Sequence, residues 1–148
     1  MNMVSNAAAS SSSRIADGVL RRRRVLIVDN DPTISRVVVR ILAGEHETHT
    51  CTVAREAIAL LASGSRFDVI LCDFLMPELS GNDFFRAVSS IDPAIAARIV
   101  FITGAASLPE VQAFLSSISN VVLEKPFTRV ALRDTVRSVA GGVVVQKD

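Results

Sequence analysis

Three short, mainly apolar segments constrain the fold of this chain more than any other feature of its sequence. They are VLIVD at residues 25–29, FDVILC at residues 67–72 and RIVFIT at residues 98–103. A strand that is apolar on both faces is typical of a parallel sheet with helices covering both sides. The three segments therefore predict buried strands of an α/β protein.

Segments with helical periodicity separate these strands, so helices and strands alternate along the chain. The predicted helices are residues 33–43, 53–63, 82–90, 111–118 and 128–140. A more polar segment at residues 46–51 and a short one at residues 121–123 predict two further strands. Short connections and right-handed crossovers then favour one five-stranded parallel sheet with helices on both faces.

Local signals indicate where some of the helices begin and end. Asp29 and Asp31 precede a proline and are candidates to cap the first helix. Ser107 and Glu110 have the spacing of a capping box ahead of the fourth helix. The dipeptide Asp92-Pro93 indicates a turn after the third helix.

The composition predicts one soluble globular domain with an extension at each end. Apolar residues make up 49% of the 148 residues and charged residues 21%, which argues against a globally disordered chain. We expect a flexible Ala/Ser/Arg-rich lead at residues 1–23, a single domain at residues 24–140 and a tail at residues 141–148. The run Arg21–Arg24 is interpreted as the solvated end of this lead.

The distribution of charge argues against a nucleic-acid-binding domain. Residues 1–24 contain five arginines and one aspartate, a net charge of +4, while the whole chain carries +1. The remaining residues therefore carry −3, which is +1 minus +4. A mildly acidic domain is a poor electrostatic match for nucleic acid, so no direct binding is expected.

The sequence predicts a cytoplasmic protein without a membrane span. No run approaches the ~20 apolar residues that a spanning helix needs, and the arginines come too late in the lead for a signal peptide. Cys51 and Cys72 lie in apolar segments and are expected to be buried free thiols. His46 and His49 are interpreted as surface residues on one face of an exposed strand.

Polar residues end or directly follow four of the five predicted strands, at the edge where parallel sheets form their ligand sites. They are Asp29-Asn30-Asp31, Asp73, Thr103 and Lys125-Pro126. Clustered carboxylates repel one another and so indicate a bound cation, and an all-oxygen set suits Mg²⁺. A carboxylate beside Mg²⁺ can attack a phosphoryl group to give an acyl phosphate. The sequence therefore predicts a phosphoryl-transfer site at this edge.

Lys125 and Thr103 supply chemistry that such a site needs. A lysine ammonium group neutralises phosphoryl oxygens as a point charge, and a threonine hydroxyl donates a hydrogen bond to one of them. Lys125 is the only lysine between residues 1 and 146, in a chain that otherwise uses arginine for positive charge. This choice favours a compact charge over the planar fork of an arginine.

Four sequence blocks, in order and with matching spacing, resemble those of the receiver domains of two-component response regulators. The blocks are VLIVDNDP, VILCDFLMPELSG, IVFITG and VLEKPF, and the resemblance covers about residues 24–140. It implies a flavodoxin-like fold with strand order 2-1-3-4-5. It also implies a signalling module that promotes its own phosphorylation and dephosphorylation, and not a turnover enzyme. The partner would be a histidine kinase or a phosphotransfer protein, with an unknown output partner.

The same resemblance implies roles for individual residues. Asp73 would be the phosphoryl acceptor, Lys125 the phosphoryl-binding lysine and Thr103 the switch hydroxyl. The Mg²⁺ site would be formed by Asp29, Asn30, Asp73 and the backbone carbonyl of Leu75. The family also has a cis peptide bond after its lysine.

The chain departs from the family pattern at two places, positions 30 and 122. Asn30 stands where most receivers have an acidic residue, so we expect Mg²⁺ binding weakened by ~1–2 kcal/mol, or roughly tenfold. Val122 stands where many receivers have an aromatic residue that rotates with the threonine, so readout without an aromatic switch is expected. Leu75 and Ala105 are apolar and cannot orient an attacking water, which predicts a comparatively long-lived acyl phosphate.

Two other functions stand as alternatives. A pseudo-receiver would keep the fold as a protein-interaction module but would no longer use the phosphate, because of Asn30. A haloacid-dehalogenase-like phosphatase would use Asp29 as its nucleophile, but it needs an acidic pair after the lysine, where only Asp134 precedes the tail. Nucleotide-binding loops of the G-x-G-x-x-G or G-x-x-x-x-G-K-[ST] type are absent from the sequence. The sequence is compatible with a stand-alone receiver and with the receiver domain of a hybrid histidine kinase.

Overall fold

Five parallel strands form one sheet in the order β2-β1-β3-β4-β5. A computed structural model describes residues 22–141, and residues 1–21 of the predicted lead and 142–148 of the predicted tail lie outside this range. The strands are β1 (Arg24–Val28), β2 (Glu47–Cys51), β3 (Val69–Asp73), β4 (Ile99–Thr103) and β5 (Val122–Glu124). The predicted fold class and strand order are confirmed.

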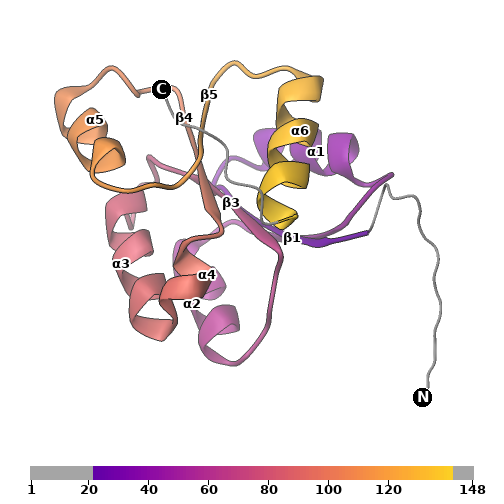
Figure 1. Cartoon of the computed structure of the whole chain (residues 1–148), viewed down its shortest axis with the longest axis horizontal. Coiled ribbons are helices and arrows are strands. Elements are labelled where there is room, and N and C mark those ends of the chain that lie inside the picture. Colours follow the sequence, from indigo (N-terminus) through magenta and orange to yellow (C-terminus); the bar gives the residue numbers. More distant parts are fainter. Residues whose placement is uncertain (1–21, 142–148) are drawn as a thin grey trace.

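Helices cover both faces of the sheet, as predicted (Figure 1). They are α1 (Pro32–Leu42), α2 (Ala54–Ala62), α3 (Gly81–Ile91), α4 (Pro93–Ala96), α5 (Pro109–Ser116) and α6 (Arg129–Ala140). Buried residues of α1 and α6 pack with one face of the sheet, and those of α2, α3, α4 and α5 pack with the other. Within residues 22–141, no helix is long and apolar enough to cross a membrane.

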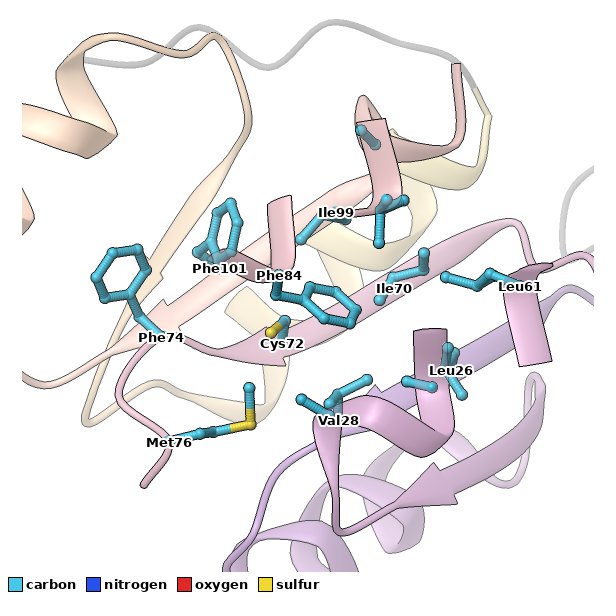
Figure 2. Packing of buried hydrophobic residues seen from close by; sticks show 14 of the residues in the cluster. Leu26, Val28, Leu61, Ile70, Cys72, Phe74, Met76, Phe84, Ile99 and Phe101 are labelled. Atoms are coloured by element: carbon cyan, nitrogen blue, oxygen red, sulfur yellow. The ribbon is translucent and has the colours of Figure 1, made fainter. Parts of the chain in front are cut away.

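The alternation of side chains along each strand explains why the central strands are apolar throughout. Leu26 and Val28 of β1 belong to the hydrophobic cluster under α2–α5, whereas Val25 and Ile27 belong to the cluster under α1 and α6. Because successive side chains point to opposite faces, both faces of β1 need apolar residues. Figure 2 shows the first cluster, in which strand residues Leu26, Val28, Ile70, Cys72, Ile99 and Phe101 lie near Leu61 and Phe84 of the helices.

A short helix, α4, occupies the place where only a turn was predicted. Asp92 caps this helix, because its Oδ1 accepts a hydrogen bond from the N–H of Ala94 at 2.9 Å, and Pro93 is its first residue. An aspartate followed by a proline is a signal for the start of a helix as well as for a turn. The prediction of five helices was therefore wrong by one within the described residues.

The capping box predicted ahead of α5 is also wrong. The helix begins at Pro109, its N-cap residue is Leu108, and no side chain caps it. Because α5 starts earlier than predicted, Glu110 lies in its first turn and Ser107 lies before the N-cap position. The hydroxyl of Ser107 is therefore not at the position from which a capping residue bonds the first turn.

His46 is buried, contrary to the prediction that it lies on the surface. Its exposed fraction is 2%, and its Nδ1 accepts a hydrogen bond from the backbone N–H of Arg23 at 3.2 Å. It directly precedes β2, and residues three apart in an extended segment point to opposite sides. Only His49 is therefore exposed.

Cys51 and Cys72 are free and buried, as predicted. Each pairs with Val28, from the two strands that flank β1. Two strand spacings therefore separate them, about 10 Å, and this distance exceeds the reach of a disulfide.

Candidate functional site

Asp29 and Asp73 lie side by side at the carboxyl edge of the sheet. The strands β1 and β3 are neighbours, and Val28 pairs with Cys72 at the end of their ladder. Asp29 directly follows Val28 and Asp73 directly follows Cys72. The parallel register therefore places the two aspartates level with each other. The topology thus brings together two carboxylates that are distant in the sequence.

Asp73 ends β3 and faces the ammonium group of Lys125. The Nζ of Lys125 lies 3.6 Å from Oδ1 of Asp73, and the two side chains are 29% and 12% exposed, respectively. Lys125 follows β5, and its backbone N–H donates a hydrogen bond to the carbonyl of Thr103 at 2.9 Å. This bond anchors the lysine to the end of β4, from which its side chain reaches Asp73. The Lys125-Pro126 peptide bond is cis, as the resemblance implied.

Thr103 is the last residue of β4 and is buried, with an exposed fraction of 1%. Its Oγ1 accepts a hydrogen bond from the backbone N–H of Ala105 at 2.9 Å. Asp73 pairs with Ile102, so Thr103 lies one residue further along the same edge. A hydroxyl that accepts one hydrogen bond can still donate another, so Thr103 can serve as a donor to a ligand at this edge.

Asp29 is buried and is held by the backbone that follows it. Its exposed fraction is 4%, and its Oδ1 accepts a hydrogen bond from the N–H of Asp31 at 2.8 Å. Asp31 is the residue that caps α1, because its own Oδ1 accepts a hydrogen bond from the N–H of Thr33 at 2.9 Å. Of the two aspartates that were candidates for capping, only Asp31 caps the helix, and Asp29 lies beside Asp73.

Asn30 and Leu75, the other two residues predicted for the metal site, are both exposed. Leu75 has an exposed fraction of 51%. Asn30 lines a small cavity of about 80 Å³ together with Met76 and Pro77 of the loop after β3. The loops that follow β1 and β3 therefore lie next to each other, which places Asn30 close to the segment that carries Leu75.

Burial raises the pKa of both carboxyl groups at this edge. For Asp29, the hydrogen bond from Asp31 lowers the pKa and the charge of Asp73 raises it, and the net direction is upward. For Asp73, the charge of Lys125 lowers the pKa, but burial outweighs it. Two partly desolvated carboxylates beside one lysine leave negative charge that a bound cation would neutralise.

The donor atoms at this edge fit Mg²⁺. This ion prefers oxygen ligands and is usually bound through one or two carboxylates while it keeps several waters. Asp29 and Asp73 offer two carboxylates, and the amide of Asn30 and the backbone carbonyl of Leu75 offer neutral oxygens. In the described part of the chain, no three or more His, Cys, Asp or Glu side chains are grouped to hold a metal. A site built on two carboxylates, neutral oxygens and water is compatible with that finding.

The sequence matches the family model of the response regulator receiver domain over residues 25–137. The response regulator receiver protein CpdR of Brucella abortus is 33% identical over 119 residues, which cover 79% of this chain and 93% of that protein. The chemotaxis protein CheY of Pseudomonas aeruginosa is 26% identical over 118 residues, which cover 78% of this chain and 94% of that protein.

Solved structures with similar sequences share the fold. The chemotaxis protein CheY4 of Vibrio cholerae has a TM-score of 0.68 at 31% identity, covering 80% of this chain and 99% of that chain. The receiver domain of a sensor histidine kinase from Pseudomonas aeruginosa, solved with a magnesium ion in its active-site cleft, has a TM-score of 0.71 at 23% identity. That match covers 82% of this chain and 99% of the other.

Proposed function

The chain belongs to the family of response regulator receiver domains of two-component systems, and we propose that it accepts a phosphoryl group on Asp73 in the cytoplasm. The donor would be a histidine kinase or a phosphotransfer protein. The observation that carries this proposal is the contact between Lys125 and Asp73, whose charged groups lie 3.6 Å apart at the carboxyl edge of the sheet. Asp73 combines a cation beside it with partial exposure, whereas the neighbouring Asp29 is buried.

The proposed transfer forms one bond and breaks one. A carboxylate oxygen of Asp73 attacks the phosphorus of a phosphohistidine, and the P–N bond breaks with its electron pair returning to the imidazole, which takes up a proton. Lys125 neutralises charge on the phosphoryl oxygens, and the O–H of Thr103 donates a hydrogen bond to one of them. The product is an acyl phosphate on Asp73.

Asp29, Asn30, Asp73 and the backbone carbonyl of Leu75 would hold Mg²⁺, which when bound neutralises charge on the transferred group. The position of Asp29 and Asp73 directly after the paired residues Val28 and Cys72 supports a cation at this place, because it brings two carboxylates together. The magnesium ion in the active-site cleft of a structurally similar receiver domain supports the same assignment. Because Asn30 offers a neutral oxygen, we expect an affinity roughly tenfold lower than with an aspartate, or ~1–2 kcal/mol.

The proposed output does not depend on an aromatic residue at position 122. Val122 is a partly buried aliphatic residue that packs against the cluster under α2–α5. The chain has no tyrosine and no tryptophan. We therefore expect the change on phosphorylation to begin at the loop after Thr103, because the hydroxyl that accepts the bond from the Ala105 N–H would then also donate one to the phosphoryl group.

A pseudo-receiver is the second candidate function, and Asn30 is the observation that favours it. Such a module would bind its partner whether or not Asp73 is phosphorylated. The placement of Asp73, Thr103 and Lys125 at one edge supports the phosphoacceptor instead. A phosphatase with Asp29 as nucleophile has less support, because Asp29 is buried and its Oδ1 accepts a hydrogen bond from the N–H of Asp31.

Intact-mass measurement after incubation with acetyl phosphate and Mg²⁺ separates these candidates. The mass gained is compared among the wild type, Asp29→Asn and Asp73→Asn. Gain of one phosphoryl group by the wild type, abolished by Asp73→Asn, is the result that the proposal predicts. No gain in any variant would favour the pseudo-receiver, and a gain that survives Asp73→Asn but not Asp29→Asn would favour the phosphatase.

A further inference from the structure

Phe74, the residue after Asp73, is tied through its backbone to two other elements. Its N–H donates a hydrogen bond to the carbonyl of Ile102 at 3.0 Å, and its carbonyl accepts one from the N–H of Gly81 at 2.8 Å. Gly81 is the first residue of α3. A direct backbone bond therefore closes the loop of residues 74–81, which carries Leu75, at its base.

The ring of Phe74 lies against Gly81 so closely that no side chain fits between them. A Cβ atom built at position 81 would meet Cδ1 of Phe74 first, and would lie 2.7 Å from Cε1 and 2.9 Å from Cγ. Real Cβ atoms essentially never come within 3.0 Å of another heavy atom. Any residue other than glycine at this position must therefore displace the ring or the backbone.

The ring of Phe74 is also held on its other sides, so it cannot simply swing away. Its exposed fraction is 4%, and its centroid lies 5.5 Å from that of Phe101 and 5.6 Å from that of Phe114. Phe101 belongs to β4 and Phe114 to α5, and Figure 2 shows Phe74 beside Phe101. Protein interiors are close-packed and transmit such displacements. A side chain at position 81 would therefore push on the backbone one residue from Asp73.

Neither backbone conformation nor helix formation explains a glycine at position 81. Gly81 does not have the positive φ that favours glycine, in contrast to Gly64. Gly81 is a helical residue, and alanine is a much better helix former than glycine. The close approach of Phe74 is the physical reason that remains.

We propose that Phe74 is a positioning residue for phosphorylation of Asp73. Clamped between Gly81 on one side and Phe101 and Phe114 on the other, it fixes the end of β3 and the base of the loop that carries Leu75. It acts through the backbone that it shares with Asp73. This inference rests on the proposed function, because it gives Phe74 a part in the reaction of that site.

A double-mutant cycle tests the clamp. Gly81→Ala is made in the wild type and in Phe74→Leu, whose smaller side chain can take another rotamer in the space that the ring leaves. The rate of phosphorylation by acetyl phosphate is measured at a temperature where circular dichroism shows every variant folded. We expect Gly81→Ala to slow the reaction about tenfold to 100-fold with Phe74 present, and less than about threefold with leucine. Phe74→Ala, which removes all three contacting ring atoms, is the second partner variant.

A matched glycine provides the control for the substitution itself. Gly44 lies outside this region, has no positive φ, and a Cβ atom there would meet nothing within 4 Å. Gly44→Ala is expected to leave the rate unchanged. Equal slowing by Gly81→Ala in the phenylalanine, leucine and alanine backgrounds, or no slowing at all with Phe74 present, would overturn the proposal.

Amide hydrogen exchange gives a readout that does not require phosphorylation. The N–H of residue 81 bonds to the carbonyl of Phe74, so Gly81→Ala is expected to speed its exchange, and Phe74→Leu is expected to restore its protection in the double variant. If the wild type takes up no phosphoryl group, the proposed function fails while this exchange pattern still supports the clamp. Unchanged protection in Gly81→Ala would overturn the clamp even in a protein that is phosphorylated normally.

Discussion

The ammonium group of Lys125 lies 3.6 Å from the carboxylate of Asp73, across the end of β4. The lysine neutralises part of the charge of Asp73 and lowers its pKa, although burial keeps the net shift upward. Asp29, on the other side of Asp73, has no comparable cation within bonding distance among residues 22–141. The carboxyl edge of the sheet therefore holds more negative than positive charge. A bound cation would neutralise this excess, and Lys125 would also face a phosphoryl group on Asp73.

Replacement of Lys125 tests its role as a point charge for the phosphoryl oxygens. Lys125→Ala is expected to slow phosphorylation by acetyl phosphate about 100-fold or more, because one preorganised electrostatic donor is lost. Lys125→Arg keeps the charge but spreads it over a planar fork, so an intermediate rate is expected. The rate of phosphorylation of the wild type and the two variants is measured by intact mass on reactions quenched at a series of times. If Lys125→Ala were phosphorylated at the wild-type rate, Lys125 would have no role in the reaction.

Substitution of Asn30 tests the weakened Mg²⁺ site. Asn30→Asp adds a carboxylate at the edge and is expected to tighten Mg²⁺ binding roughly tenfold, measured by titration calorimetry. It is also expected to lower the melting temperature without Mg²⁺, because like charges are added. Gln112→Glu, an exposed change on α5 that adds the same charge elsewhere, is the control. Equal Mg²⁺ affinity in the wild type and Asn30→Asp would show that position 30 does not bind the ion.

The lifetime of the acyl phosphate tests the apolar environment of Asp73. Leu75 is 51% exposed and cannot orient water, so Leu75→Asn is expected to shorten the lifetime about tenfold by supplying a polar group that can. Stability is expected to change little, because the side chain is on the surface. Leu108→Asn, at a position 46% exposed ahead of α5, serves as the matched control. A lifetime unchanged by Leu75→Asn, in a wild type that already decays within seconds, would contradict the prediction.

His46 gives the protein a pH-dependent stability that is separate from the candidate site. Burial lowers its pKa below 6.5, nearby arginines lower it further, and Glu45 opposes them. Because the unfolded state binds the proton more tightly, this contribution to stability is complete above pH 6.5 and is lost as the pH falls through the lowered pKa. The slope reaches at most about 1.4 kcal/mol per pH unit.

Urea unfolding at a series of pH values measures the effect of His46. His46→Asn keeps an acceptor where Nδ1 receives the N–H of Arg23 but cannot take up a proton, so its stability is expected to fall less between pH 7 and pH 5. His49→Asn, at the exposed histidine, is the control and is expected to follow the wild type. The prediction would be contradicted if the free energy of unfolding fell equally with pH in the wild type and in His46→Asn.

Much of the fold could be predicted because burial on both faces leaves a local pattern. Each central strand contributes to two hydrophobic clusters, so its sequence is apolar without interruption. The adjacency of Asp29 and Asp73 is a consequence of the strand order that the resemblance implies, because that order makes the first and third strands neighbours. Parallel strands deliver the residues at their carboxyl ends to one edge, and this holds whatever their side chains are.

Contacts that depend on packing between distant segments could not be predicted in this way. The burial of His46 depends on the backbone of Arg23, and nothing in the local pattern indicates that contact. The clamp of Phe74 by Gly81 depends on how the loop between them closes. In the sequence, the register of Gly81 with Asp73 argues against an ordinary turn glycine, but it does not indicate which residue Gly81 contacts. The short helix α4 was missed because one dipeptide signals both a turn and a helix start.

Asp73, and not Asp29 or Asp31, is expected to carry the phosphoryl group, and reductive trapping tests this directly. Borohydride reduces an acyl phosphate to an alcohol and so converts a phosphorylated aspartate into homoserine. After treatment with acetyl phosphate and Mg²⁺, peptide mass spectrometry is predicted to find homoserine at position 73 and unmodified aspartate at positions 29 and 31. Homoserine at position 29, or at no position in protein that binds Mg²⁺, would contradict the assignment of Asp73 as the acceptor.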